Sequence, residues 1–439
     1  MKNLKNNIYL KISAIFVIVM LLLIPTNMIK GLIHEREFTQ KMAIKEVSSK
    51  WGEEQTLTGP FITIPYNKYI KQYSQKDSTN KIVKIKDYIH FLPTQLVVNG
   101  KINPERRNRA IYEIVVYNSK LEISGSFDNL NFSEFDIPKK DIQFDKATLS
   151  LGISDLRGIE QQVSLKWNSE LFSFNPGTVT RNIIESGINT GISINENDST
   201  SYQFTLNLDL KGSQKLYFIP VGEISDVTIT SEWNNPSFNG AFLPDSRTVK
   251  DSGFEANWNI LHLNRNFPQK WTGSINNISE SAFGIDLLLP VDSYQKSMRS
   301  IKYALLFICF TFIVFFFVEV LRKVFIHPIQ YILVGIALVV FYTLLLSISE
   351  HLSYNSAFII SAIATLLLII GYVKAILKSN QLTMLLGGIL SILYAFIFVI
   401  IQLQDYALLI GSIGIFIILG LVMYFSRKID WYNLNLDEK

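Results

Sequence analysis

The chain has 439 residues, of which 48% are apolar and only 18% are charged. Its apolar residues gather in one run near the N-terminus and in a dense block after residue 300, which argues against an ordinary water-soluble enzyme. A formal net charge of +4 excludes the strongly basic surface that nucleic-acid binding requires, and the single cysteine, Cys309, excludes an intramolecular disulfide or a cysteine metal cluster. The composition therefore predicts a membrane protein.

The first apolar run, from Ile12 to Ile29, lies between Lys11 and Lys30. It is just long enough to cross a bilayer core of about 30 Å. A cleaved signal peptide is the alternative, but the run ends without a small-x-small cleavage site. We therefore expect an uncleaved anchor, and assign residues 1–29 to a cytoplasmic N-terminus and the first span.

Residues 30–300 are close to neutral and are predicted to form a large β-rich extracytoplasmic domain. A short stalk helix is expected from His34 to Trp51, and beyond it the apolar period changes to two. Tyr202 to Leu210 alternate without a break, as in a strand with one buried face. Turn-rich pieces such as Asn99-Gly100 separate the strands, which form one large sandwich or two small ones. The other predicted strands are Phe61–Tyr66, Ile82–Leu92, Ile111–Tyr117, Leu121–Phe127, Ala147–Ile153, Val163–Trp167, Leu216–Pro220, Val227–Trp233 and Phe283–Leu289.

Residues 301–426 are predicted to form a five-helix membrane bundle, followed by a cytoplasmic tail at 427–439. The expected spans are Tyr303–Val320, Ile329–Ile348, Ala357–Val373, Leu382–Leu403 and Tyr406–Phe425. Together with the anchor they make six α-helical transmembrane spans, one N-terminal and five C-terminal. Within this bundle Ala357, Ser361 and Thr365 recur every four residues, as on a close-packed helix face.

Basic residues predict the orientation of these spans. Cytoplasmic loops carry an excess of Lys and Arg, and a long translocated segment such as 30–300 is largely exempt from this rule. Both termini are therefore expected in the cytoplasm. The basic residues that fall on the inner face in this arrangement are Arg322, Lys323, Lys374, Lys378, Arg427 and Lys428.

Motifs for catalysis, cofactors and metals are missing from the sequence. The histidines have no HExxH-type spacing, and no phosphate-binding loop, GxGxxG fingerprint or GxSxG elbow is present. The tetrad from Ser293 to Lys296 matches SxxK, but its partner motifs KTG and SDN are absent, so we interpret it as a polar juxtamembrane linker. We therefore predict no catalytic residue, no cofactor and no metal ligand.

Four polar residues at the ends of spans are the candidate functional side chains: Glu319, His327, Glu350 and His351. Glu319 has Arg322 and Lys323 at i+3 and i+4, where a helix brings them alongside, so an interfacial ion pair is expected and a proton or ion relay is the alternative. His327 precedes the helix-starting Pro328. Because the four flank the spans on both faces, they need not form one site.

Several stretches of the sequence match a known family: Gly59-Pro-Phe-Ile-Thr-Ile-Pro65, Asp155-Leu-Arg-Gly158, Pro236 to Pro244, and a continuous block from Asp292 to His351. On these stretches the chain resembles the CreD family of bacterial inner-membrane proteins over nearly its whole length. The resemblance implies a multi-pass inner-membrane protein tied to cell envelope integrity, colicin tolerance and envelope stress. It supplies no catalytic residues to carry over.

The leading hypothesis is a non-enzymatic envelope protein in the lipid bilayer, without a nucleic-acid partner. Its periplasmic β domain binds a periplasmic protein, lipid or cell-wall component, and its bundle holds or transmits that state. The alternative is a transporter or channel subunit that uses the C-terminal bundle, and a membrane enzyme ranks last. The sequence leaves the ligand and the oligomeric state open.

Overall fold

The computed structural model describes residues 8–74, 79–128, 130–195, 201–274, 278–289, 293–322, 324–403, 406–427 and 429. The chain divides into two compact units, Met1–Lys41 with Val291–Lys439 and Met42–Pro290. We call them the helical unit and the β unit, and describe each by itself. Two of the basic residues used for orientation, Lys323 and Lys428, lie outside the described residues.

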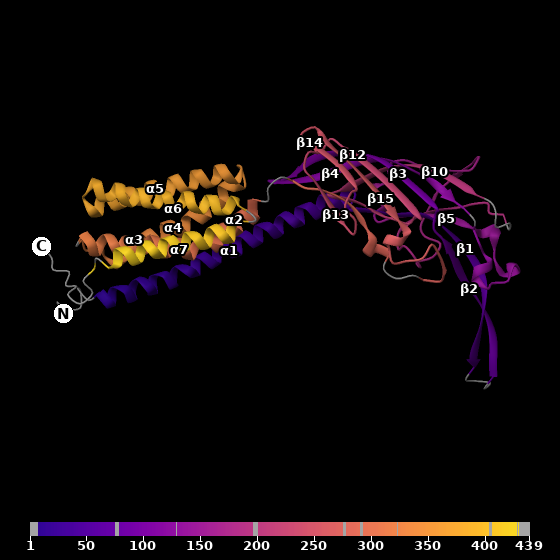
Figure 1. Cartoon of the computed structure of the whole chain (residues 1–439), viewed down its shortest axis with the longest axis horizontal. Helices are drawn as coiled ribbons and strands as arrows, with labels where there is room; N and C mark the ends of the chain where they lie inside the picture. Colours follow the sequence, from indigo (N-terminus) through magenta and orange to yellow (C-terminus); the bar gives the residue numbers. More distant parts are fainter. Residues whose placement is uncertain are drawn as a thin grey trace. The chain divides into compact units, whose positions relative to one another are not determined.

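Long apolar helices build the helical unit (Figure 1). Six helices have the length and composition to cross a membrane, which confirms the predicted six spans, one before the β-rich region and five after it. The last residues of the first helix already belong to the β unit. The helices are α1 (Ile8–Trp51), α2 (Ser293–Lys302), α3 (Ala304–Arg322), α4 (Pro328–Ser349), α5 (Tyr354–Leu377), α6 (Asn380–Gln402) and α7 (Ala407–Ser426).

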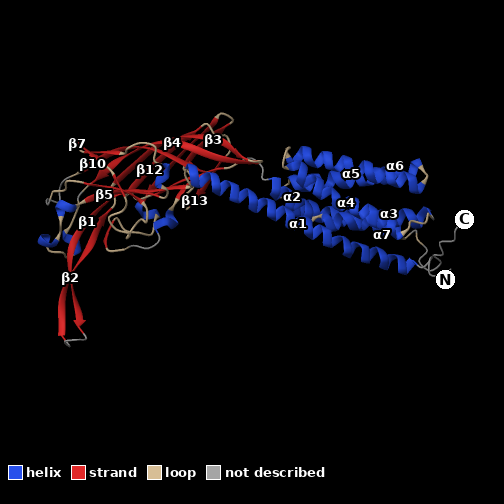
Figure 2. Ribbon diagram, turned by 180° about the vertical axis from the view of Figure 1, so that it is seen from behind, coloured by secondary structure: helices blue, strands red, loops and turns tan. Residues whose placement is uncertain are grey.

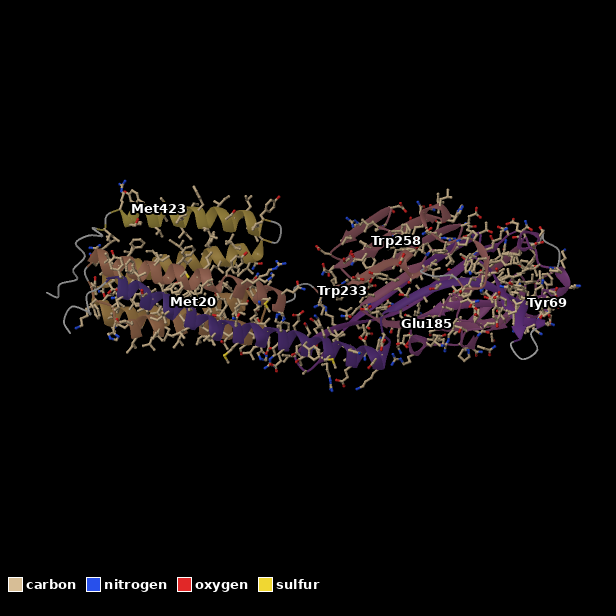
Figure 3. All side chains as sticks on the ribbon, turned by 90° about the horizontal axis from the view of Figure 1, so that it is seen from below. Met20, Tyr69, Glu185, Trp233, Trp258 and Met423 are labelled. Atoms are coloured by element: carbon tan, nitrogen blue, oxygen red, sulfur yellow. The ribbon has the colours of Figure 1, made fainter. Side chains whose placement is uncertain are left out.

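The outer surfaces of these helices are apolar. Met20 on α1 and Met423 on α7, both labelled in Figure 3, are exposed, as are many Leu, Ile and Phe side chains. A water-soluble helix would carry polar residues on this face. The exposed apolar surface is therefore the part of the unit that contacts the bilayer.

The linker predicted from Ser293 to Lys296 is wrong, because these residues open the helix α2. Tyr294, Ser297 and Ile301 are buried on one face of α2, at the three-to-four-residue spacing of a helix. The pattern escapes a search for apolar runs because the buried face of this helix is largely made of hydroxyl-bearing side chains.

Two sheets build the β unit, in which strands predominate (Figure 2). The first has the order β13-β17-β11-β1-β5-β9-β8, with β2 paired to β1 and β16 to β2. The second has the order β14-β15-β12-β3-β4-β10-β6-β7. The strands are β1 (Gln55–Ser74), β2 (Thr79–Phe91), β3 (Gln95–Arg109), β4 (Tyr112–Phe127), β5 (Thr148–Ile153), β6 (Ser164–Trp167), β7 (Glu170–Ser173), β8 (Asn175–Pro176), β9 (Gly187–Gly191), β10 (Tyr202–Ser213), β11 (Lys215–Ile219), β12 (Ile224–Ser231), β13 (Pro236–Gly240), β14 (Ser246–Lys250), β15 (Gly253–Leu261), β16 (Lys270–Thr272) and β17 (Phe283–Leu287).

Most pairs of neighbouring strands are antiparallel, but each sheet has one parallel pair. β1 pairs in parallel with β11, and β3 with β12. Both pairs join an early strand to one that comes much later in the sequence. Each parallel pair therefore joins a strand from the first half of the β unit to one from its second half within the same sheet.

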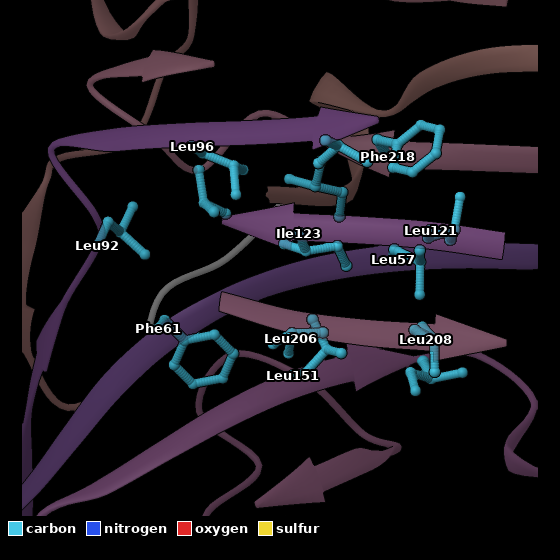
Figure 4. Close-up of a cluster of buried hydrophobic side chains, with 14 of the residues drawn as sticks. Leu57, Phe61, Leu92, Leu96, Leu121, Ile123, Leu151, Leu206, Leu208 and Phe218 are labelled. Carbon is cyan, nitrogen blue, oxygen red and sulfur yellow. The ribbon is translucent and has the colours of Figure 1, made fainter. Parts of the chain in front are cut away.

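The two sheets share one hydrophobic core (Figure 4). Phe61 and Leu151 come from the first sheet, and Ile123 and Leu206 from the second, and all four are almost inaccessible to solvent. Alternating residues along β10 are buried, as its sequence pattern predicted. The β unit therefore has a single core rather than two small ones.

The predicted turn at Asn99-Gly100 is wrong, because both residues lie inside β3. A Cβ on Gly100 would approach side-chain atoms of Ile229 and Leu121 to 2.6 Å. Gly100 is therefore needed to let these two side chains meet over the strand. Glycine in a strand often marks such a close approach rather than a turn.

Candidate functional site

Glu319 is fully buried in the last turn of α3, where it holds three other parts of the helical unit. It forms an ion pair with Lys11 of α1. The hydroxyl of Tyr331 on α4 donates to Glu319 Oε2 at 2.9 Å, and the backbone N–H of Ile326 donates to Glu319 Oε1 at 3.1 Å. A buried carboxylate needs such a set of donors, because each unmade bond costs free energy in a medium of low dielectric.

Of the two partners predicted for Glu319, Arg322 is wrong. The pair is made with Lys11, from near the start of the sequence, whereas Arg322 is exposed on the helix surface. Lys323 lies outside the described residues. An i+3 or i+4 spacing places side chains on neighbouring positions of one helix, but it does not show that the acid faces outward. Here Glu319 faces inward, toward α1 and α4.

Lys11 is buried beside Glu319 and an aromatic ring. Its Nζ lies 4.4 Å from the centre of the Phe325 ring, in addition to its ion pair with Glu319. Further along α1, Leu22 packs against Gly335 of α4 so closely that a Cβ on the glycine would lie 2.2 Å from the leucine. An ion pair and an apolar contact together fasten α1 to the other helices of the unit.

His327 has a local structural role. Its Nδ1 accepts a hydrogen bond from the backbone N–H of Ile329 at 3.3 Å, and the backbone N–H of His327 donates to Gln330 Oε1 at 2.9 Å. This is a reciprocal cap at the start of α4. The imidazole is exposed, and its position follows from the helix start.

Glu350 lies at the other end of α4. It accepts a hydrogen bond from the Tyr294 hydroxyl at 3.2 Å, and its Oε1 lies 3.5 Å from Arg36 Nε of α1. His351, the next residue, is exposed. Because α4 has 22 residues, about 33 Å separates its ends, so the four predicted residues fall into two places.

A second polar cluster lies at the Glu350 end of the helical unit. Lys296 Nζ donates to Gln402 Oε1 at 3.0 Å, and Gln402 donates to Asn355. The lysine of the SxxK tetrad is thereby engaged in a contact between helices. The cluster ties α2, α5 and α6 together and resembles no nucleophile–base arrangement.

The β unit carries a group of exposed apolar side chains on an arm, which we define as residues 67–74 of β1 and 79–86 of β2. Beyond Tyr66, the described partner of β1 is β2 alone, in a register that runs from Asn67↔Lys86 to Ser74↔Thr79. Figure 2 shows this pair of strands projecting from the rest of the β unit. Its base is held by hydrogen bonds from Tyr69 to Asp141 and from Lys68 to Asp87.

The arm mixes apolar and basic side chains. Ile82 is 70% exposed and Tyr69, labelled in Figure 3, is 55% exposed. Lys71 lies opposite Ile82, and Lys84 lies opposite Tyr69. The sequence predicts the strand Ile82–Leu92 but not the arm, because only the register shows that these two strands extend beyond their neighbours.

The Asp155-Leu-Arg-Gly158 stretch binds the end of α1 within the β unit. Asp155 accepts hydrogen bonds from the backbone N–H of Glu53 at 2.9 Å and from Arg157 Nε at 2.8 Å. Burial of Asp155 opposes its ionisation, but the bonds from Arg157 and from two backbone N–H groups outweigh burial and lower its pKa. Arg157 also donates to the carbonyl of Ser49 near the end of α1.

Among the described residues, no three His, Cys, Asp or Glu side chains lie close enough together to hold a metal ion. The polar clusters described above consist of ion pairs and hydrogen bonds between structural elements.

Comparison with known proteins assigns the family. The family model described as "Inner membrane protein CreD" matches residues 7–432. The chain belongs to the CreD family. The inner membrane protein CreD of Escherichia coli strain K12 is 33% identical over 438 residues, which cover 99% of this chain and 96% of that protein. Family membership and the six apolar helices together make this a multi-pass inner-membrane protein.

Solved structures add nothing to this assignment. Two crystal structures of the M1 zinc metallopeptidase from Deinococcus radiodurans each align with 38% of this CreD-family chain and with 38% and 39% of their own chains. The identities are 7% and 8%, and both TM-scores are 0.19. A likeness this weak carries no argument about fold or function.

Proposed function

We propose that this CreD-family protein supports cell envelope integrity without catalysing a reaction, and that its β unit lies outside the cytoplasm and binds an envelope partner there. The observation that carries this proposal is the arm. Two-stranded ribbons are marginally stable alone, and exposed apolar side chains on them cost free energy unless a partner covers them.

The side chains of the arm define the chemistry of that partner. Ile70, Ile82 and Ile85 are apolar and exposed, and Lys71, Lys84 and Lys86 stand among them. The complementary surface combines apolar groups with carboxylates, and a protein surface or an added strand offers both. Partner capture by the arm would keep the membrane bundle beside its partner in the envelope.

Dye entry into cells that lack the protein tests this proposal. After a mild detergent or β-lactam challenge, the intact chain is expected to restore the barrier. Ile82→Asp is expected to restore it about fivefold less well at equal protein levels, because a carboxylate replaces an apolar side chain that is 70% exposed. Leu263→Asp is the matched control, since Leu263 is 79% exposed elsewhere on the β unit.

Equal rescue by Ile82→Asp and the intact chain would refute a role for the arm. A chain without residues 55–290 that inserts stably and rescues fully would place the function in the helical unit instead.

The second candidate function is transport or a channel, and the buried pair of Lys11 and Glu319 favours it. Ionisable residues within spans often mark proton or ion pathways. If this pair relays protons, the intact chain in proteoliposomes is expected to show proton-dependent flux, and Glu319→Gln is expected to abolish that flux. If the intact chain shows no flux, the pair of Lys11 and Glu319 serves only to hold α1 against α3.

A further inference from the structure

A long apolar groove runs between α3, α6 and α7 inside the helical unit. Its volume is about 650 Å³, and of its described lining residues only Arg322 carries a charge. The other lining side chains are Leu, Ile, Val and Phe, together with Gly414. Apart from Arg322, the lining has no polar side chain that could orient a water-soluble ligand.

The length of the groove matches one leaflet of a bilayer. Its lining runs along α3 from Phe310 to Arg322, a rise of about 18 Å at 1.5 Å per residue. Half of a hydrocarbon core is about 15 Å. One lipid chain extended along α3 would therefore reach from the middle of the bilayer to the level of Arg322.

The helix α7 covers this groove incompletely. Of its described residues only Gly414 is buried, where a Cβ would lie 2.0 Å from the Phe396 ring of α6. Ile417 and Leu421 line the groove and are nevertheless more than half exposed. The groove is therefore open sideways, in the direction from which a lipid would enter.

Arg322 gives the groove a charged end. Glu319, one turn earlier on α3, is paired with Lys11 and therefore does not neutralise the charge of Arg322. Arg427, which stacks on Tyr424 at 4.6 Å, adds a second guanidinium just after the end of α7. Guanidinium groups bind phosphate through paired hydrogen bonds, and basic pockets between membrane helices bind anionic lipid headgroups.

We propose that this groove binds the acyl chain of an anionic phospholipid whose headgroup lies on Arg322. The apolar lining holds the chain, and the guanidinium selects headgroups with a net negative charge over zwitterionic ones. This lipid site is separate from the arm of the β unit and does not depend on the envelope role proposed above.

Native mass spectrometry of the full chain tests the site. The probes are phosphatidylglycerol and phosphatidylcholine with identical acyl chains, added to the delipidated protein in detergent. The intact chain is expected to retain phosphatidylglycerol about fivefold better, as one basic residue near an anionic headgroup provides. Arg322→Gln is expected to remove this preference. Lys374→Gln, which removes an exposed charge near the end of α5, is expected to keep it.

Equal retention of the two lipids by the intact chain would overturn the proposal, as would an unchanged preference in Arg322→Gln. Val314→Trp, which fills the groove, is expected to reduce retention of both lipids. If Val314→Trp does not fold, Arg322→Gln alone tests the site, because replacing an exposed side chain is expected to leave folding intact. Disulfide-linked dimers of Ile417→Cys in membranes, with Cys309→Ala, would show that a second copy covers the groove, and would also overturn it.

Discussion

The pair of Lys11 and Glu319 shows that i+3 and i+4 spacing along one helix does not identify the partner of a buried charge. The acid was recognisable as an ionisable residue inside a span. Its partner was not, because the contact joins α1 to α3 and only packing of the helices brings the two together. Tyr331 was equally hidden, since a tyrosine in an apolar span gives no signal until its hydroxyl is seen to donate.

Glu319→Gln is expected to lower the free energy of unfolding of the full chain by about 3 kcal/mol, because it leaves a buried ammonium without its counter-charge. Thermal unfolding in detergent checks this. The exposed Glu35→Gln is the matched control and should change little. Replacing both partners, as Lys11→Met with Glu319→Leu, should recover most of the loss. An unchanged midpoint in Glu319→Gln would contradict the fastening role.

His90 makes the β unit sensitive to acid. It is fully buried, its Nδ1 lies 3.0 Å from the Thr63 hydroxyl, and its ring packs on Trp271 at a centroid distance of 5.3 Å. Burial lowers the pKa of His90 to about 4, from an ordinary value of 6.5. Between pH 6.5 and about pH 4, the unfolded chain therefore binds a proton at His90 that the folded chain does not bind.

The expected pH dependence follows from this shift. The contribution of a neutral His90 to stability is complete above pH 6.5 and is lost progressively down to about pH 4, by about 3 kcal/mol in all. Denaturant titrations followed by tryptophan fluorescence, between pH 7.5 and pH 4.5, measure it. His90→Asn should be less stable at pH 7.5 but should show a flatter dependence. Parallel curves for the two chains would contradict the assignment to His90.

At the scale of elements, the end of α1 and the start of β1 depend on a short 3₁₀ helix, Leu156–Gly158. Gln55 Nε2 donates to the carbonyls of Asp155 at 2.9 Å and of Lys211 at 3.0 Å, which closes the space around Gly158. A Cβ on Gly158 would lie 2.3 Å from the carbonyl oxygen of Lys211, a backbone atom that cannot turn aside.

Gly158→Ala is therefore expected to destabilise the β unit by about 2 kcal/mol through overpacking. Gly191→Ala is the control, because a Cβ there meets no atom within 4 Å, and it should stay within about 0.5 kcal/mol of the parent chain. Urea unfolding followed by tryptophan fluorescence distinguishes them. Equal stability of the two variants would show that the 3₁₀ helix shifts freely.

Elements with a strong period were predictable, and elements defined by their neighbours were not. The six apolar helices begin and end within a few residues of the predicted spans, apart from α1, which continues beyond its apolar run into the predicted stalk. The strand β10 was predictable from the unbroken alternation of apolar and polar residues along it. By contrast β3 was missed, because Asn99 and Gly100 are turn-formers in isolation and become strand residues only between β4 and β12.

Two predicted strands, Ile111–Tyr117 and Leu121–Phe127, are one strand, β4 (Tyr112–Phe127). The polar residues between them interrupt the apolar pattern, yet Ser119 is buried and donates to the carbonyl of Leu210. A serine satisfied by a neighbouring strand cannot be told from a turn serine without the partner. The arm on β1 and β2 also escaped prediction, because only the strand register shows it.

For the whole molecule, the distribution of basic residues predicts that both termini lie in the cytoplasm. Single cysteines in a Cys309→Ala background check this in intact cells. A membrane-impermeant maleimide is expected to label Leu352→Cys, between α4 and α5, directly. It should label Gln381→Cys, in the first turn of α6, only after lysis. The reverse pattern would place the β unit in the cytoplasm and remove the basis for an envelope partner.

The two parallel strand pairs of the β unit have a consequence for biosynthesis. Gln55 on β1 pairs with Leu216 on β11, and Gln95 on β3 pairs with Ile224 on β12. A ribosome that adds 5–20 residues per second needs on the order of ten seconds to make the later strand of each pair. During that interval β1 and β3 have an edge that no later strand yet covers, which is an aggregation hazard. We therefore expect the newborn chain to need protection of these two edges until its second half has been made.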